Sequence, residues 1–202
     1  MNHQRESTCA LSPIGRRIHV IGNSASGKTS LAKRLALVLD VDFVELDALN
    51  WLPNWVGLNA TNPDELRRRF ETATNGDGWI AAGSYTQFAK QTFWSRLDTV
   101  IWLDLPIPVL LWRVVRRSWR RWRSKQLLWG TNFERFWPQL AFWRGDDSLI
   151  YWIISAQRRK RESMLASMAD PCWRKIRFVR LTSTQEIESF ATSIERALSE
   201  IT

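Results

Sequence analysis

An eight-residue glycine-rich motif constrains the fold of this chain more than any other feature. Residues 22–29 read Gly-Asn-Ser-Ala-Ser-Gly-Lys-Thr and fit the phosphate-binding pattern G-x-x-x-x-G-K-[ST]. The apolar residues 17–22 predict a buried strand that leads into the motif, and residues 28–39 predict a helix that leaves it. Because the pattern needs a strand before it and a helix after it, this context indicates a phosphate-binding loop.

The residue types within the motif suit a triphosphate. Gly22 and Gly27 let the backbone bend so that amide groups converge on an anion, and the helix start adds its positive dipole end. We expect Lys28 to reach the β- and γ-phosphates and the Thr29 hydroxyl to ligate a bridging Mg²⁺. The residues predicted to contact ATP are Gly22, Asn23, Ser24, Ala25, Ser26, Gly27, Lys28, Thr29 and Ser30.

Composition excludes several other kinds of site. The 202 residues suit one α/β domain. Two cysteines, Cys9 and Cys172, lie far apart in the sequence and indicate neither a disulfide framework nor a zinc cluster. With only two histidines, a Ser-His-Asp arrangement has no support either. A reducing compartment fits this cysteine usage, so we predict a cytoplasmic protein.

No segment resembles a membrane span or a secretion signal. Residues 1–13 are polar and lack the apolar stretch of such a signal. The longest apolar run, 99–112, is interrupted by Asp104 and two prolines and is too short to span a bilayer. We therefore expect a soluble protein with no membrane partner, in which a flexible extension, 1–15, precedes one domain, 16–202.

Apolar runs alternate with helical patterns, which is typical of a parallel sheet covered by helices on both faces. The predicted strands are 17–22, 42–46, 78–82, 99–103 and 175–181. The predicted helices are 28–39, 63–75, 86–96, 107–127, a pair within 133–168, and 185–198. The sequence therefore predicts the α/β class with a five-stranded parallel sheet.

Residues that act beside the loop are expected at the carboxyl ends of neighbouring strands. In an extended strand Glu45 and Asp47 point to the same side, and we expect Asp47, at the tip, to act as a general base or a magnesium ligand. After the third strand, Gly83 would let a substrate approach and the Tyr85 hydroxyl would position it; a plain turn explains these residues equally well. Asp104 ends the fourth strand, either as a third carboxylate of the site or as a turn residue.

The formal net charge of +9 implies an acidic partner, and much of the charge is local. Seven basic residues lie between positions 113 and 125, on the predicted helix after the fourth strand. Guanidinium groups on a mobile lid commonly stabilise a phosphoryl group during transfer, and we place such a lid at about 113–145. About half of these arginines are expected to form a solvated face. The candidates are Arg113, Arg116, Arg117, Arg120 and Arg121.

Thirteen tryptophans are unusual for a chain of this length. On the arginine-rich helix, Trp112, Val115, Trp119 and Trp122 share one face. We expect this face to pack on the body of the protein. A membrane surface or a nucleic acid is the alternative partner for a helix that is both basic and aromatic.

Five segments of the chain together resemble a known family. They are the loop 22–29, the run Leu-Asp-Ala-Leu-Asn-Trp-Leu-Pro-Asn-Trp at 46–55, and residues 79–85, 96–106 and 113–117. Over about 18–198 the chain is similar to the small adenylate-kinase-like P-loop proteins often labelled topology modulation proteins. Very many proteins share the loop, whereas the run at 46–55 is far more particular.

The resemblance implies an ATP-binding, kinase-like core with a three-layer P-loop NTPase fold and the strand order 2-3-1-4-5. It also implies an arginine lid after the fourth strand, an adenine-side loop near residues 182–183 and an acceptor pocket near the ends of the second and third strands. The acceptor-binding residues expected on this basis are Asp47, Gly83, Tyr85 and Arg96.

One residue departs from the family pattern. Relatives commonly carry an aspartate at the end of the third strand, and this chain has Ala82. Either Asp47 or Asp104 then supplies the outer-shell carboxylate for magnesium, or magnesium-dependent turnover is weakened.

The sequence supports two functions of different classes. The first is an ATP-dependent phosphotransferase that acts on a small nucleotide-like or hydroxylated acceptor. Its catalytic residues would be Lys28, Asp47, Arg113, Arg116, Arg117 and Arg120, with Mg²⁺ at Thr29 and Asp47. The second is a nucleic-acid-associated ATP-binding protein whose Trp/Arg helix binds phosphate backbones. Against the second, a kinase lid already accounts for these arginines, and the sequence has no helix-turn-helix or RNA-binding motif.

Overall fold

A five-stranded parallel sheet forms the centre of the protein. The computed structural model describes residues 14–124, 127–128, 132–133 and 149–200. The strands are β1 (Arg17–Gly22), β2 (Asp42–Glu45), β5 (Trp79–Ala82), β6 (Thr99–Leu103) and β9 (Arg177–Leu181). They pair in the order β2-β5-β1-β6-β9, which is 2-3-1-4-5 when the five are counted along the chain. The predicted α/β class and its parallel sheet are confirmed.

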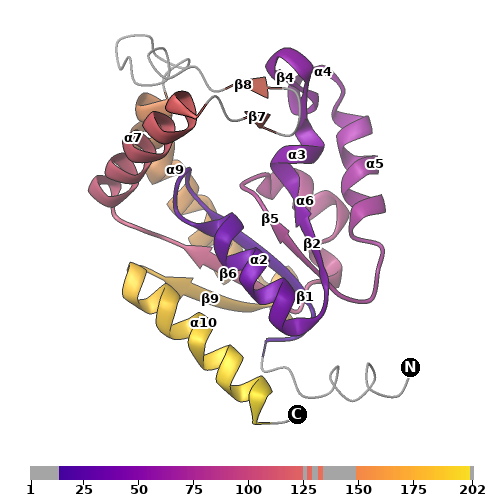
Figure 1. The fold of residues 1–202 in the computed structure, drawn as a ribbon. Helices are drawn as coiled ribbons and strands as arrows, with labels where there is room; N and C mark the ends of the chain where they lie inside the picture. Colours follow the sequence, from indigo (N-terminus) through magenta and orange to yellow (C-terminus); the bar gives the residue numbers. More distant parts are fainter. Residues whose placement is uncertain (1–13, 125–126, 129–131, 134–148, 201–202) are drawn as a thin grey trace.

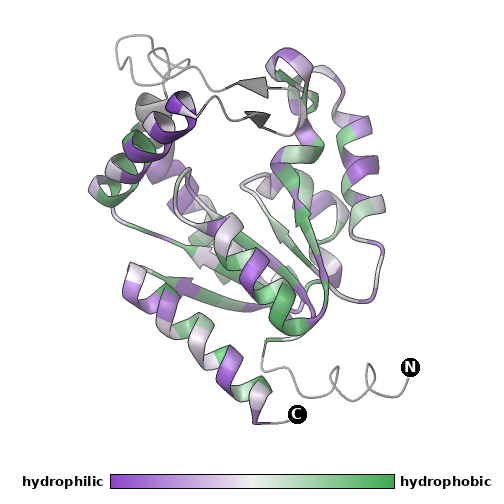
Figure 2. Ribbon diagram, in the orientation of Figure 1, coloured by the Kyte–Doolittle hydropathy of each residue, from purple (hydrophilic) through white to green (hydrophobic). Residues whose placement is uncertain are grey.

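Helices cover both faces of this sheet (Figure 1). The covering helices are α2 (Lys28–Leu39), α5 (Pro63–Ala73), α6 (Thr86–Thr92), α9 (Leu149–Ala169) and α10 (Thr184–Ser199). Alternate residues of β1 serve the two cores, since Ile18 and Val20 pack with α2 and α10 while Ile21 packs with α5, α6 and α9. A strand buried on both faces requires this two-residue period. Figure 2 shows much of the central strands in the green of apolar residues.

Shorter elements connect these layers. Between β2 and α5 the chain forms α3 (Leu46–Asn50), β3 (Trp51–Leu52), η1 (Pro53–Trp55), β4 (Val56–Gly57) and α4 (Leu58–Thr61). Further along it forms η2 (Trp94–Arg96), α7 (Ile107–Arg123), β7 (Leu127–Leu128), β8 (Asn132–Phe133) and η4 (Pro171–Trp173). None of the helices in the described part of the chain is long and apolar enough to cross a membrane.

Several predicted boundaries differ from the structure. The second strand stops at Glu45, because the next residues turn at once into α3. The helix predicted at 86–96 is interrupted at Phe93, where α6 gives way to η2. The helix predicted at 107–127 ends at Arg123. Of the helix pair predicted within 133–168 the structure contains α9, while residues 134–148 lie outside the described part, as do residues 1–13 of the predicted N-terminal extension.

The tryptophan face of α7 does not pack on the body of the protein. Trp112 is 61% exposed, Trp119 47% and Trp122 44%. The buried residues of this helix are instead Leu110 and Val114 on its first turns, together with Ser118. The expectation of a buried tryptophan stripe was therefore wrong, because the helix contacts the body through a different and less aromatic face.

One buried histidine joins β1 to two other elements. The Trp94 indole donates to Nδ1 of His19 at 3.0 Å, and Nε2 lies 3.1 Å from the carbonyl oxygen of Gly83. Because an indole N–H only donates, Nδ1 must accept and Nε2 must carry the proton. Burial lowers the pKa of His19 from 6.5 to about 3, against an opposing effect of the Gly83 carbonyl. The neutral imidazole thus fixes the segment that follows β5.

Candidate active site

The loop Gly22–Thr29 links β1 to α2 at the carboxyl edge of the sheet. Its two glycines are needed for different reasons. A Cβ on Gly22 would come within 2.5 Å of the Ser26 hydroxyl and 3.0 Å of the Leu103 carbonyl oxygen, so the turn leaves no room for a side chain. Gly27 has φ +97°, a conformation that side-chain-bearing residues rarely adopt. The loop is thus compact and presents backbone amides at the start of α2, as anion binding requires.

Lys28 is the first residue of α2 and is half-buried at the mouth of the loop. Burial is the largest cause that lowers its pKa, and the cations Arg117 and Arg121 lower it further. The charges of Asp47 and Glu45 act in the opposite direction. An anion placed against Lys28 would remove this penalty on the ammonium form.

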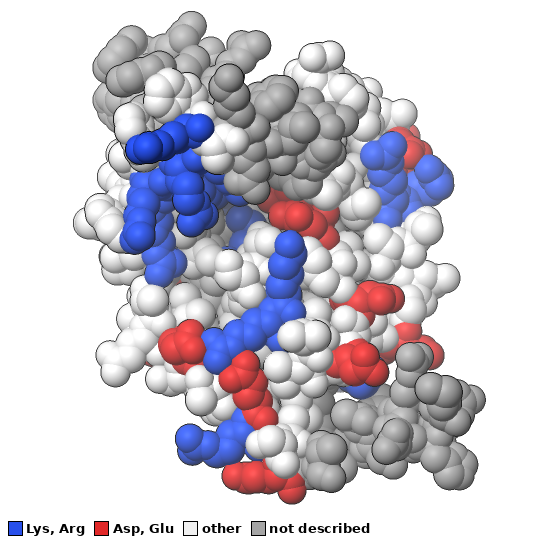
Figure 3. Space-filling view, viewed as in Figure 1, with Lys and Arg blue, Asp and Glu red and all other residues white. Residues whose placement is uncertain are grey.

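Three arginines of α7 face the loop. They are spaced four residues apart, so they share one side of the helix. Arg113 donates to the Ser26 carbonyl at 3.1 Å and to the Thr184 hydroxyl at 2.8 Å. Arg117 donates to the Ser24 hydroxyl at 3.1 Å. The third is Arg121, whose charge acts on Lys28. Figure 3 shows basic side chains gathered over α7.

Two other predicted arginines lie on the exposed side of α7. Arg116 is exposed, and its guanidinium lies 5.2 Å from the centre of the Trp112 ring. Arg120 is exposed as well. Both point away from the loop, because they are offset by one residue from the series that faces it. The structure therefore does not bring these two predicted catalytic residues to the site.

Asp47 reaches the site from α3 instead of from a strand tip. It lies in the first turn of that helix and is half-buried. The Tyr85 hydroxyl, just after β5, hydrogen-bonds its carboxylate. Burial and then the charge of Asp47 raise the pKa of Tyr85, so the phenol stays protonated and acts as the donor. The sequence did not indicate this contact between Asp47 and Tyr85, and the expectation that Asp47 extends a strand was wrong because the chain turns into α3.

Gly83 has a packing role that the sequence did not indicate. A Cβ there would lie 2.7 Å from the Cβ of Leu46, so the glycine lets α3 pack against the end of β5. The next residue, Ser84, donates its hydroxyl to the Gly22 carbonyl at 2.5 Å. This segment therefore joins α3 to the phosphate loop, and the missing side chain of Gly83 leaves the space that Leu46 occupies.

Residues of α9 that the sequence analysis missed also contact the loop. The Asn23 amide donates to Gln157 at 2.7 Å, and the Lys160 ammonium donates to Asn23 Oδ1 at 3.5 Å. Burial, followed by the charge of Lys28, lowers the pKa of Lys160 to about 7. The basic run at 157–161, Gln-Arg-Arg-Lys-Arg, was the available signal.

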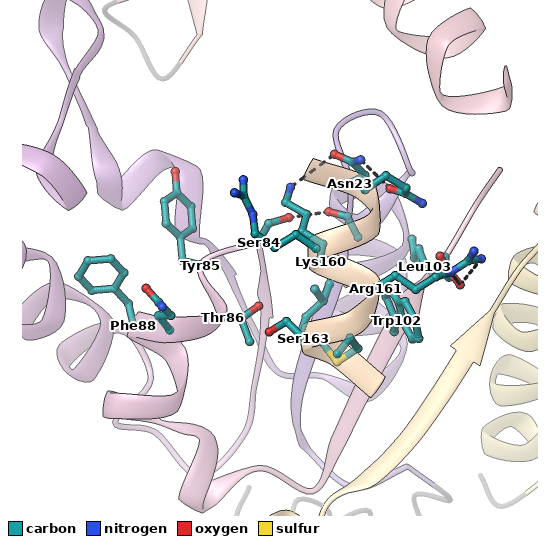
Figure 4. A pocket seen from close by; sticks show the side chains of 17 residues that line it. Asn23, Ser84, Tyr85, Thr86, Phe88, Trp102, Leu103, Lys160, Arg161 and Ser163 are labelled. Carbon is teal, nitrogen blue, oxygen red and sulfur yellow. Dashed lines mark hydrogen bonds and ion pairs between the residues drawn. The ribbon is translucent and has the colours of Figure 1, made fainter. Parts of the chain in front are cut away.

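Two hollows flank the loop, each of about 390 Å³. The first lies between the loop, the start of α6 and α9, and Figure 4 shows Tyr85, Thr86 and Lys160 on its wall. The second lies between α2, α7 and α10, where its lining includes Ser30 and Thr184. A ligand of nucleoside size fits the scale of either hollow, so the loop has room for one group on each side.

The chain resembles known proteins in its fold and not in its sequence. No protein-family model and no curated protein matches the chain. Among solved structures, a gluconokinase from Sinorhizobium meliloti 1021 is 16% identical, with 92% of this chain and 93% of that chain covered, at a TM-score of 0.50. The present chain therefore has the same fold as that kinase, the P-loop kinase fold. A shikimate kinase from Acinetobacter baumannii in complex with shikimate is 17% identical at a TM-score of 0.49, with 96% and 97% covered.

Other polar groups of this P-loop kinase fold have structural roles. The buried Asp104 accepts hydrogen bonds through one oxygen from Arg161, at 2.8 and 2.9 Å, and from Arg180, at 2.5 and 2.9 Å. Its carboxylate thus joins α9 and β9 to the end of β6. Arg96 donates to the carbonyl and hydroxyl of Thr74, at the edge of the sheet away from the phosphate loop, and the structure does not bring it together with Asp47 and Lys28.

Proposed function

We propose that this protein transfers the γ-phosphoryl group of ATP to a hydroxyl group of a small acceptor. The observation that carries the proposal is the convergence of charged groups on the loop mouth. Lys28 lies there with Asp47 from α3, and Arg113 and Arg117 hydrogen-bond the loop from α7. Three elements, α2, α3 and α7, thus contribute charged groups of the kinds that phosphoryl transfer needs.

The donor half of the proposed site is the loop and the hollow beside α10. The residues 22–30 would hold the phosphates through their amides, and Lys28 would contact the β- and γ-phosphates. The adenine would occupy the hollow near Thr184. Support for this orientation comes from Arg113, which hydrogen-bonds both the loop and Thr184 and so closes the same hollow.

The acceptor half lies on the other side of the loop. The acceptor oxygen would form a bond to the γ-phosphorus, the bond from that phosphorus to the bridging oxygen would break, and ADP would leave. Asp47 would take the proton of the acceptor hydroxyl, while the Tyr85 hydrogen bond holds the carboxylate in position. Arg113, Arg117 and Arg121 would stabilise the charge on the equatorial oxygens of the moving group.

Magnesium fits the oxygen atoms that the site offers. Mg²⁺ in such sites is held by one or two protein oxygens together with the substrate phosphates. Thr29 and Asp47 supply a hydroxyl and a carboxylate near Lys28. When bound, the ion would neutralise charge on the β- and γ-phosphates. A role close to adenylate kinase, membership of the topology modulation subgroup and a cytoplasmic location remain predictions.

ADP release tests the proposal directly. The full chain is incubated with ATP, Mg²⁺ and a panel of nucleosides, nucleotides, sugars and hydroxy acids. We expect one class to stimulate ADP formation, and Lys28→Met to reduce it by at least about a hundredfold because a transition-state contact is lost. Lys33→Met, an exposed position on the same helix, is the matched control and keeps the rate. A broad panel without any stimulated turnover would refute the proposal.

A further inference from the structure

The hollow beside α9 carries an excess of positive charge. Its lining includes three consecutive basic residues of that helix, Arg159, Lys160 and Arg161. Asp104 is the one acidic side chain among the described residues that line it, and it is engaged by Arg161 and by Arg180. Arg159 and Lys160 add further positive charge to this wall, so the hollow is electrostatically suited to an anion.

Lys160 occupies the position where such an anion would meet the loop. Its side chain extends from α9 toward Asn23, and its ammonium lies 3.5 Å from Asn23 Oδ1 (Figure 4). The charges that act on it come from Lys28, Asp47 and Arg159. Two of these three are cations, and the lysine is mostly removed from water. A negatively charged group beside Lys160 would therefore stabilise its charged form.

On the basis of the proposed function, we infer that the acceptor carries an anionic group, a carboxylate or a phosphate, besides the hydroxyl that receives the phosphoryl group. Lys160 binds that anionic group. The aromatic wall of the hollow, formed by Tyr85 and Phe88, packs against the uncharged part of the acceptor. Tyr85 also carries the hydrogen bond to Asp47, so the hydroxyl end of the acceptor faces that carboxylate.

A binding assay with matched ligand pairs tests this inference without relying on turnover. The full chain is saturated with Mg²⁺ and a non-hydrolysable ATP analogue, and its thermal unfolding is followed as each ligand is added. The pairs are gluconate and sorbitol, ribose 5-phosphate and ribose, and AMP and adenosine. The first pair probes a carboxylate and the other two a phosphate.

Three variants complete the design. Lys160→Met removes the charge at similar length, and Lys160→Arg keeps a charge. Arg158→Met is the matched control, since Arg158 lies on the same helix, is largely exposed and pairs with Glu162. We expect the charged member of at least one pair to stabilise the wild-type protein more than its neutral partner does. In Lys160→Met the dissociation constant of that ligand should rise by about tenfold or more, while Lys160→Arg and Arg158→Met stay within about threefold of wild type.

The outcomes separate this inference from the proposed function. The inference is overturned if no charged ligand stabilises the wild-type protein more than its neutral partner, or if the preference survives in Lys160→Met. It is also overturned if Lys160→Met weakens binding of the ATP analogue alone and leaves the ligand pairs unchanged, because the lysine would then serve the donor phosphates. Failure of the wild-type protein to bind the analogue, measured first, would instead count against the proposed function.

Discussion

Acid should destabilise this protein through His19, whose hydrogen-bond partners in the core are the uncharged Trp94 and Gly83. The imidazole is fully buried and neutral, and its pKa falls from 6.5 to about 3. Between these two values the unfolded chain binds a proton that the folded protein does not bind. The free energy of unfolding therefore decreases as the pH falls below 6.5, at a limiting slope of about 1.4 kcal/mol per pH unit.

The size of the effect follows from this linkage. Between pH 7 and pH 5 the protonation of the unfolded state at His19 removes about 2 kcal/mol of stability. Because the lowered value of about 3 lies well below pH 5, this figure depends almost entirely on the ordinary pKa of 6.5. It is a large share of the total stability of a domain, which is commonly about 5 to 15 kcal/mol.

Urea unfolding at pH 7, 6 and 5 measures this loss. Carboxylates also titrate near pH 5, so the comparison is made with His19→Gln, which cannot titrate but keeps a hydrogen-bonding side chain. The variant is less stable at pH 7, since the Trp94 and Gly83 contacts are disturbed. Between pH 7 and pH 5, however, the variant should lose about 2 kcal/mol less stability than the wild-type protein loses. Equal declines in the two proteins would show that His19 is not buried as a neutral base.

Two further changes probe the site and its support. Arg117→Met should lower kcat by about a hundredfold. Arg116→Met, on the exposed side of the same helix, is the control and should keep kcat within about twofold of wild type. Similar losses of kcat in both variants would contradict the orientation of α7. Asp104→Asn leaves Arg161 and Arg180 without their counter-charge and should lower the free energy of unfolding by about 2 kcal/mol. This loss is smaller than the usual cost of breaking a buried ion pair, because both arginines are partly exposed. Urea unfolding at pH 7 checks the second change, and no loss of stability would show that the Asp104 pairs contribute nothing to the fold.

The sheet and the loop were predictable because their signals are local. The motif at 22–29 fixes a strand before it and a helix after it, and both appear with the predicted bounds, Arg17–Gly22 and Lys28–Leu39. The end of β2 was less predictable. Asp47 was expected on an extended strand, but the chain turns into α3 after Glu45, and a five-residue helix is too short to leave a clear period.

The orientation of α7 could not be deduced from its periodicity. The helix carries two apolar faces, one with Trp112 and Trp119 and another with Leu110 and Val114. A pattern identifies both faces as apolar but does not state which one meets the body of the protein. The structure buries the second face, and that choice turns Arg113 and Arg117 toward the loop while Arg116 and Arg120 point to solvent.

The contribution of α9 was hidden for a related reason. Gln157, Lys160, Arg161 and Met164 are spaced three, one and three residues apart, so they lie on one side of the helix. Of these only Met164 is apolar and fully packed. An inward face made mostly of polar residues produces no hydrophobic period, and a search for amphipathic helices therefore misses it.

That polar face ties α9 to the strand-end carboxylate Asp104. Asp104 anchors α9 through Arg161, and the neighbouring Lys160 is thereby held against Asn23 of the loop. Adjacent helical residues point about 100° apart, so these two contacts together fix the rotation of α9 about its axis. The helix is set relative to both the sheet and the phosphate loop by ion pairs and hydrogen bonds. A charge-neutral substitution at Asp104 should therefore disturb the position of Lys160 as well as the stability of the fold.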